Sequence, residues 1–181
     1  RRVLGPYLSR DDFGWMGFTK RAGRPNNWNP WINSNVLAAT LLVEPSDARR
    51  ADIVHKVLRS LDKFLGPYPK DGSCDEGPAY WGRAGASLFE SLELLQSASA
   101  GRINEFADPL IANMGRFAYR VRISGNWVVD VGDSDPDVGV DHGLVYRYGV
   151  SIGDPDRHHR HPNARGRRAR DAGQHLVRIE R

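Results

Sequence analysis

Two apolar stripes at helical spacing, joined by a turn of two residues, run from Pro30 to Leu65. Pro30 suits a first helical turn, and Glu44-Pro45 ends the helix that it starts. Ser46 is then a typical N-cap for a second helix, with Asp47 in its first turn. The apolar positions are Ile32, Val36, Ala39 and Val43 in the first stripe and Ile53, Val57, Leu61, Phe64 and Leu65 in the second. Two helices joined so closely are expected to pack as an antiparallel hairpin.

A second pair of helices is predicted beyond the loop at 66–72, where glycines and prolines stop the preceding helix. One helix should begin near Pro78, and the other should cover Pro109 to Val121. Their expected buried faces are Trp81, Ala84, Leu88, Leu92 and Leu95, then Leu110, Ile111, Met114, Phe117 and Val121. The sequence therefore predicts an all-α fold of two helical hairpins joined by a long loop.

The remaining segments carry weaker patterns. The expected elements are mostly loop at 1–29 with a helix end at 3–8, an extended segment at 126–132, an acidic turn at 133–137 and a helix at 144–152. From Asp154 the composition changes to Arg, His and Pro without an apolar period, which predicts a disordered tail. We therefore divide the chain into a helical domain at 1–153 and a tail at 154–181.

The formal net charge of +4 comes from the end of the chain. Residues 157–181 contain eight Arg against Asp171 and Glu180, a local +6, which leaves 18 basic and 20 acidic residues, a net −2, for residues 1–156. An acidic ligand would therefore have to be held by a locally basic cleft rather than by the overall field of the protein. A nucleic-acid partner would depend on the Arg-rich tail alone and is not expected.

Few cofactor or membrane signals are present. Cys74 is the single cysteine, which excludes an internal disulfide and a Cys-rich metal site, and we expect neither a metal nor another cofactor. No stretch approaches the roughly 18 apolar residues that a membrane span requires, so no span is expected. The chain starts without Met, which leaves its compartment open; a periplasmic or secreted location would fit a missing upstream signal.

The first unusual stretch, residues 25–35, holds five Asn and two Trp around a predicted helix start. Capping and an aromatic contact at the helix start would explain one Asn and one Trp. Amides exchange hydrogen bonds with hydroxyls, and indole rings cover the C–H faces of sugar rings. The whole cluster therefore favours a carbohydrate-binding cleft.

The second unusual stretch, residues 71–83, leads into the helix expected near Pro78. Gly77 and Pro78 fix the corner, so Tyr80 should lie in the first helical turn, where the helix dipole can favour a phenolate. A tyrosine that merely packs at a helix start fits the same spacing, and the spacing leaves both readings open.

These residues carry a resemblance to a known family. Asn26-Asn27-Trp28-Asn29-Pro30, the Asp71-Gly72 loop and Glu76-Gly77-Pro78-Ala79-Tyr80-Trp81, in that order around a helical hairpin, resemble the (α/α) toroid of heparinase II/III-like polysaccharide lyases, a toroid of the chondroitin AC and alginate lyase type. The likeness runs from about Arg2 to Gly153, and Glu-Gly-Pro-x-Tyr-Trp is its most specific part. It implies an incomplete (α/α) toroid that cleaves an acidic polysaccharide, heparin- or heparan-like or alginate-like, by β-elimination.

The resemblance also implies roles for individual residues. Asn27, chosen from Asn26, Asn27 and Asn29, would hydrogen-bond the C6 carboxylate and stabilise the enolate-like intermediate. Tyr80 would be the general acid and, for some stereochemistries, also the base. Arg83, one helical turn further on, would lower the pKa of Tyr80 or bind a substrate carboxylate, although a solvated Arg fits the same position. The predicted substrate-binding residues are Asn26, Trp28, Asn29, Trp31, Glu76, Trp81 and Arg83.

The family also uses a histidine as partner base, and here the sequence departs from it. His55 stands on a predicted helix between apolar neighbours, so His142 is the remaining candidate within the family-like region. Four further histidines fall in the tail, where they lack a scaffold. The family's proteins have more hairpins and a following β-sandwich domain, so we expect this chain to be a partial sequence, with a tail that would fit a shifted reading frame.

Two other classes of function remain open. A glycoside hydrolase on the same toroid would use paired carboxylates from Asp71, Asp75 and Glu76. A non-catalytic glycan-binding remnant would fit the missing histidine and the missing domain.

Overall fold

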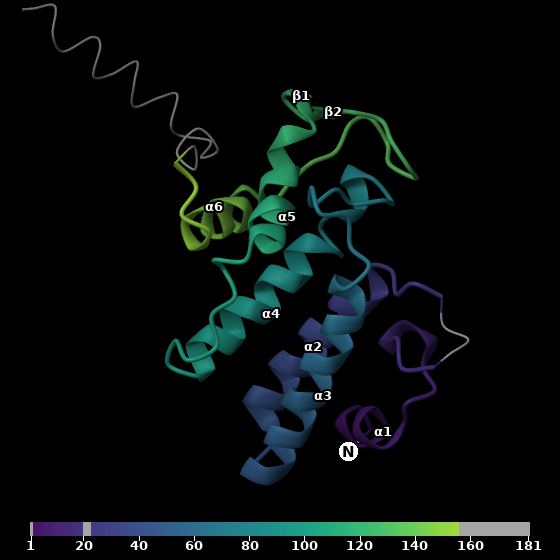
Figure 1. Cartoon of the computed structure of the whole chain (residues 1–181), viewed down its shortest axis with the longest axis vertical. Coiled ribbons are helices and arrows are strands. Elements are labelled where there is room, and N and C mark those ends of the chain that lie inside the picture. The colour runs from purple at the N-terminus through teal and green to yellow at the C-terminus, as the bar shows by residue number, and fades with distance from the viewer. Residues whose placement is uncertain (1, 20–22, 156–181) are drawn as a thin grey trace, which may run out of the picture.

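The long hairpin expected from the two apolar stripes forms the centre of the computed structural model, which describes residues 2–19 and 23–155. Figure 1 shows α2 and α3 side by side, with α1 beside their lower end and the β1–β2 turn at the opposite end of the molecule. The elements are α1 (Leu4–Ser9), η1 (Gly14–Met16), α2 (Trp28–Val43), α3 (Asp47–Leu65), η2 (Pro78–Tyr80), α4 (Gly85–Ala98), α5 (Pro109–Arg120), β1 (Arg122–Ser124), β2 (Trp127–Val128) and α6 (His142–Ser151).

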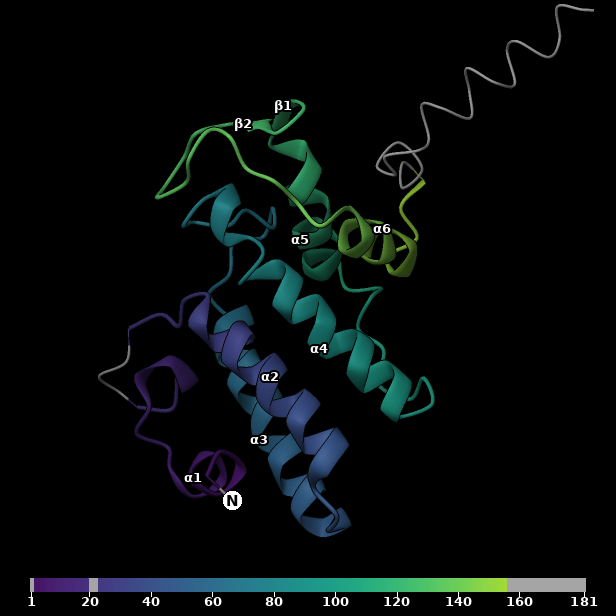
Figure 2. The same cartoon turned by 180° about the vertical axis from the view of Figure 1, so that it is seen from behind.

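The described part of the chain is thus mostly helical, as predicted, with six α-helices and one small two-stranded sheet. In both views, α1 lies beside the α2–α3 hairpin, and α5 and α6 lie on the opposite side of α4 from that hairpin (Figures 1 and 2). The prediction of a disordered tail falls on residues outside the described part, except for Asp154 and Pro155. Asp154 is buried and accepts a hydrogen bond from the Tyr119 hydroxyl.

The α2–α3 hairpin confirms the reading of the first two stripes. The Ser46 side chain accepts a hydrogen bond from the backbone N–H of Arg49, as expected of an N-cap, and α3 buries Ile53, Val57, Leu61 and Phe64. The α2 helix begins at Trp28, two residues before the predicted start at Pro30. Val43 is 68% exposed, so the last position of the first stripe lies outside the core.

A buried polar network joins the start of the chain to this hairpin. Asn29, with no exposed surface, donates to the Trp15 carbonyl and to both oxygens of Ser60. Asn33, one turn further along α2, donates to Asn29 Oδ1 and accepts from the Tyr7 hydroxyl at 2.7 Å. Because these polar groups satisfy one another, α1 and η1 can be held against α2 without leaving buried donors unpaired.

The third helix begins later than predicted. In place of a helix from Pro78, the structure has the short turn η2 and an irregular segment, and α4 starts only at Gly85. The Trp81 indole donates to the Met114 carbonyl of α5 at 2.8 Å and lies against Gly85, where a Cβ would stand 2.5 Å from its Nε1. The chain must leave the helical path here to bury that ring. Trp81, Ala84, Leu88, Leu92 and Leu95 are nevertheless all buried, as predicted.

Helices α5 and α6 pack closely on α4. Asp108 and Asp141 cap their N-termini by accepting backbone hydrogen bonds. Tyr148 of α6 is fully buried, stacks on Phe89 with 4.5 Å between ring centroids, and donates to the Ile111 carbonyl. The predicted helices at 109–121 and 144–152 are therefore confirmed, with observed bounds of 109–120 and 142–151.

The predicted extended segment at 126–132 is confirmed only in its first residues, where β2 pairs with β1. The chain beyond it, from Val129 to Asp137, returns past the η2 corner rather than forming a longer strand. No helix of the described residues is long and apolar enough to cross a membrane.

Candidate functional site

The two unusual stretches of the sequence meet through one hydrogen bond. The Asn27 side chain, at the start of α2, donates from Nδ2 to Oε2 of Glu76 over 2.5 Å. These residues are 49 positions apart, and Asn27 is only 7% exposed. The Asn-rich stretch and the Glu-Gly-Pro-x-Tyr-Trp stretch are thus parts of one local site.

Glu76 lies in an environment that disfavours its charge. Partial burial raises its pKa above the ordinary value, and the neighbouring carboxylates of Asp75 and Asp133 raise it further. Hydrogen bonds from Asn26 and Asn27 act in the opposite direction. Asp75 itself forms an ion pair with Arg24 at 3.0 Å. Glu76 is therefore the carboxyl group at this site that is best placed to hold a proton.

The loop at residues 131–134 holds the chain in place at Gly77 and Pro78. Gly77 has a φ of 95°, and a Cβ there would stand 2.2 Å from the Val131 carbonyl oxygen, so only glycine fits. The Asp133 N–H donates to the Glu76 carbonyl, and the Ser134 hydroxyl accepts from the Ala79 N–H. The residues before Tyr80 are therefore fixed by backbone contacts to residues 131–134.

Tyr80 is the last residue of η2, and 37% of its surface is exposed. It does not lie in the first turn of an α-helix, which corrects the expectation that a helix dipole favours its phenolate. No side-chain hydrogen bond joins Tyr80 to Asn27 within the described part of the chain. The two predicted catalytic residues thus come from neighbouring segments, with Asn27 largely covered and Tyr80 open to solvent.

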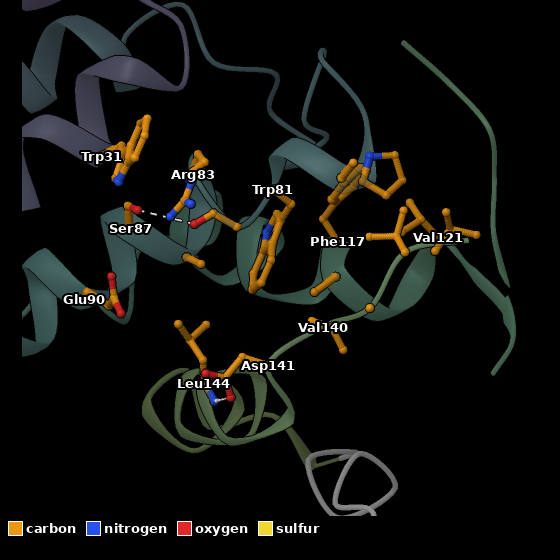
Figure 3. Close-up of a pocket in the computed structure, with 18 of the residues that line it drawn as sticks. Trp31, Trp81, Arg83, Ser87, Glu90, Phe117, Val121, Val140, Asp141 and Leu144 are labelled. Carbon is orange, nitrogen blue, oxygen red and sulfur yellow. Dashed lines mark hydrogen bonds between the residues drawn. The ribbon is translucent and has the colours of Figure 1, made fainter. Parts of the chain in front are cut away.

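A cavity of about 360 Å³ adjoins these segments. The Arg83 guanidinium stacks over the Trp31 ring at 4.3 Å, and both residues line the cavity. Figure 3 shows Trp31 and Arg83 on one wall, and Asp141 and Leu144 on the opposite wall. Its lining includes Ala79, Trp81, Gly82, Glu90, Phe117, Ala118, Arg122, Val128, Val140 and Asp141. Asn27 and Tyr80 are not among the lining residues, so the cavity neighbours the predicted catalytic pair without containing it.

The other predicted residues differ in their accessibility. Asn26 is exposed and accepts the Trp28 N–H, and Trp28 is 54% exposed beside Trp31. Asn29 has no exposed surface, so the structure corrects its predicted place in substrate binding: its amide is used by Trp15 and Ser60. Trp81 is 3% exposed, so it could contact a ligand only as part of the cavity wall.

Three more candidate residues, His142, His55 and Asp71, are exposed in the structure. His142 begins α6 and is exposed, and Asp141, just before it, lines the cavity. His55 on α3 is also exposed. Asp71 accepts the backbone N–H and the hydroxyl of Ser73, which lower its pKa. No group of three or more His, Cys, Asp or Glu in the described ranges could hold a metal ion.

Sequence reasoning missed Glu90, Arg122 and Ser134. Glu90 lines the cavity one turn beyond Ala86 on α4, on the side of the helix away from the predicted buried face, so the helical period of that face could not have indicated it. Arg122 and Ser134 reach the site through the β1–β2 turn and the 129–137 loop, whose path no local pattern predicts. Neither a family model nor a curated protein matches this chain.

Proposed function

We propose that the chain is part of a polysaccharide lyase that resembles the heparinase II/III-like family and cleaves a uronate-containing polymer by β-elimination. The observation that supports this most is the Asn27–Glu76 hydrogen bond, since it joins the two stretches on which the resemblance depends. In this proposal the α2–α3 hairpin is one unit of an incomplete (α/α) toroid, and the substrate is heparin- or heparan-like or alginate-like.

Asn27 is proposed to act on the substrate carboxylate. Glu76 accepts one N–H of the Asn27 amide, and this fixes the direction of the second N–H. An amide that is already oriented can donate to the enolate oxygen as charge develops there, without reorganising. The low exposure of Asn27 makes that hydrogen bond stronger than it would be in water, provided that the substrate reaches the amide.

Tyr80 is proposed to be the general acid. Elimination moves the C5 proton to a base, forms the C4–C5 double bond and breaks the bond between C4 and the bridging O4, and the departing oxygen needs a proton. For some stereochemistries Tyr80 would itself accept the C5 proton before it donates to O4; for the others His142, the remaining candidate base, would accept it. A phenol that is 37% exposed can be reached by a glycosidic oxygen without a change in the fold. Arg83, three residues further on, stacks on Trp31 and would keep a cationic group beside the substrate carboxylate.

A glycoside hydrolase is the second candidate. The raised pKa of Glu76 favours it, because an inverting or retaining hydrolase needs one carboxylic acid that keeps its proton. Asp75 or Asp71 would then supply the second carboxylate. Glycan binding without catalysis is the third reading.

One experiment separates the three readings. The chain is incubated with heparan sulfate, with alginate and with their oligosaccharides, while the ultraviolet absorbance of an unsaturated uronate and the release of reducing ends are followed together. The lyase proposal expects both signals, and both should be lost in Tyr80→Phe and Asn27→Ala but kept in Glu76→Gln. Asn126→Ala, an exposed asparagine of the β1–β2 turn, is the matched control and should retain activity.

The other outcomes argue against the lyase reading. Reducing ends without the absorbance, abolished by Glu76→Gln, would indicate hydrolysis. Binding of a polymer without either product would indicate a glycan-binding protein.

A further inference from the structure

The cavity beside the site contains an arginine that the proposed reaction does not use. Arg122 of β1 donates from Nη1 to the Gly125 carbonyl at 2.9 Å and from Nη2 to the Val138 carbonyl at 3.1 Å. It forms no ion pair within residues 2–19 and 23–155. Its side chain is half-buried, and this burial lowers its pKa.

A partly desolvated guanidinium is costly unless an anion or several acceptors accompany it. The two carbonyl oxygens use one N–H each of the five that arginine carries. Three N–H groups of Arg122 therefore have no hydrogen-bond partner among the described residues, and Arg122 lines the cavity. A planar guanidinium with free N–H groups matches the paired oxygens of a carboxylate, the anionic group that a uronate carries.

The rest of the lining fits a sugar ring. Trp81, Phe117, Ala118, Val128, Val140 and Leu144 give the cavity an apolar floor. Glu90 is exposed at its edge and can accept from hydroxyl groups. Asp141 also lines the cavity, but its side chain accepts the Leu144 N–H at 3.0 Å as the cap of α6. The lining therefore combines apolar surface, polar side chains that can bond hydroxyl groups (Ser34, Asn35, Ser87 and Glu90) and two arginines, Arg83 and Arg122.

The cavity adjoins both of the segments that carry the proposed catalytic residues, Asn27 and Tyr80. Trp31 stands one helical turn after Asn27, and its N–H donates to the Asn27 carbonyl. Ala79 and Gly82 line the cavity on either side of Tyr80 in the sequence. A polymer that passes Asn27 and Tyr80 would place a neighbouring ring at this cavity.

We propose that this cavity is a subsite for one uronate ring, with the ring's carboxylate bound by Arg122. The inference rests on the proposed function and names the unit that its substrate carries next to the cleaved bond. The cavity volume of about 360 Å³ suits a single ring rather than a longer piece of polymer. Arg83 extends the positive side of the wall toward Trp31.

The test measures binding rather than turnover. A saturated disaccharide whose glucuronate is the non-reducing unit, so that its O4 carries no sugar to be eliminated, is titrated into the protein by calorimetry beside its methyl ester, which lacks the charge. The unchanged protein should bind the acid about tenfold or more tightly than the ester, the effect of one charge-assisted hydrogen-bond pair. Arg122→Gln should remove that preference, and Arg122→Lys should keep part of it because the charge remains.

Arg102→Gln is the matched control. Arg102 is exposed in the turn after α4 and, among the described residues, donates to the Ser99 carbonyl alone, so this change should leave the preference intact. Because Arg122 also holds the β1–β2 turn, a merely structural role would weaken the acid and the ester equally. Benzoate, which shares a ring and a carboxylate but no hydroxyls, should bind weakly.

Three results would overturn the subsite: equal binding of acid and ester by the unchanged protein, a preference that survives Arg122→Gln, or benzoate binding where the glucuronate does not bind. The lyase proposal is tested independently of the subsite. If the protein catalyses elimination but shows no preference for the carboxylate, the subsite alone is wrong. If it shows that preference but no elimination, the proposed reaction alone is wrong.

Discussion

Replacing Asn29 by Ala tests whether this residue is a structural anchor rather than a ligand contact. The change removes donors to the Trp15 and Ser60 carbonyls and the acceptor used by Asn33, all in a site without exposed surface. A buried polar group left unpaired costs about 1–3 kcal/mol, and the Trp15 carbonyl and one Asn33 N–H lose their partner. With partial relaxation we expect the free energy of unfolding to fall by about 2–4 kcal/mol.

The assay is urea unfolding followed by circular dichroism, with the midpoint expected to fall and the slope to stay unchanged. Asn35→Ala is the matched control, because Asn35 lies on the same helix, is exposed, and bonds only the Trp31 carbonyl. The control should change stability by less than about 0.5 kcal/mol. An Asn29→Ala protein as stable as its control would refute the account of this network.

Three further predictions follow from the packing and the charges. Gly115→Ala should destabilise the protein by about 1–3 kcal/mol in the same assay, since the new Cβ would stand 2.8 Å from the fully buried Tyr148 ring. Folding raises the pKa of Glu76 above its ordinary 4.5, so its contribution to stability is fully present below pH 4.5 and is lost as the pH rises through the folded pKa. In Glu76→Gln, the free energy of unfolding measured against pH should fall less steeply over this range. Cys74, 4% exposed and with a pKa raised to about 11 by burial, should react with a thiol reagent at pH 7 about 100-fold or more slowly in the folded protein than in urea.

Local sequence patterns predicted the helices because their signals are local. The apolar period of 53–65 and the Ser46 cap predicted α3 within one or two residues, and Pro109 marked the start of α5. The start of α4 could not be predicted in this way. It depends on the Trp81 indole reaching the Met114 carbonyl, a contact between residues 33 positions apart that outweighs the helical pattern from Pro78 onward.

The candidate site was predictable only as two separate stretches. The polar excess at 25–35 and the Gly-Pro corner at 77–78 indicated function without showing that Asn27 bonds Glu76. Composition also could not separate Asn27 from Asn29, since both are amides at the start of one helix. Their surroundings differ: Asn29 points toward Ser60 in the interior, and Asn27 points toward the corner.

The corner itself is the part whose shape depends most on distant sequence. The Glu76 carbonyl accepts from the Asp133 N–H, and the Ala79 N–H donates to the Ser134 hydroxyl. Gly132, with a φ of 64°, lies so close to Glu76 that a Cβ would stand 2.7 Å from its carbonyl carbon. The 133–134 segment comes after β2, and β2 pairs with β1, the strand that carries Arg122. One continuous stretch of chain, 122–134, therefore shapes both the proposed reaction site and the proposed uronate subsite. Because the same segment carries Arg122 and contacts Glu76, the two sites should respond together to changes in its backbone path, which a substitution of an exposed side chain in the turn leaves unaltered.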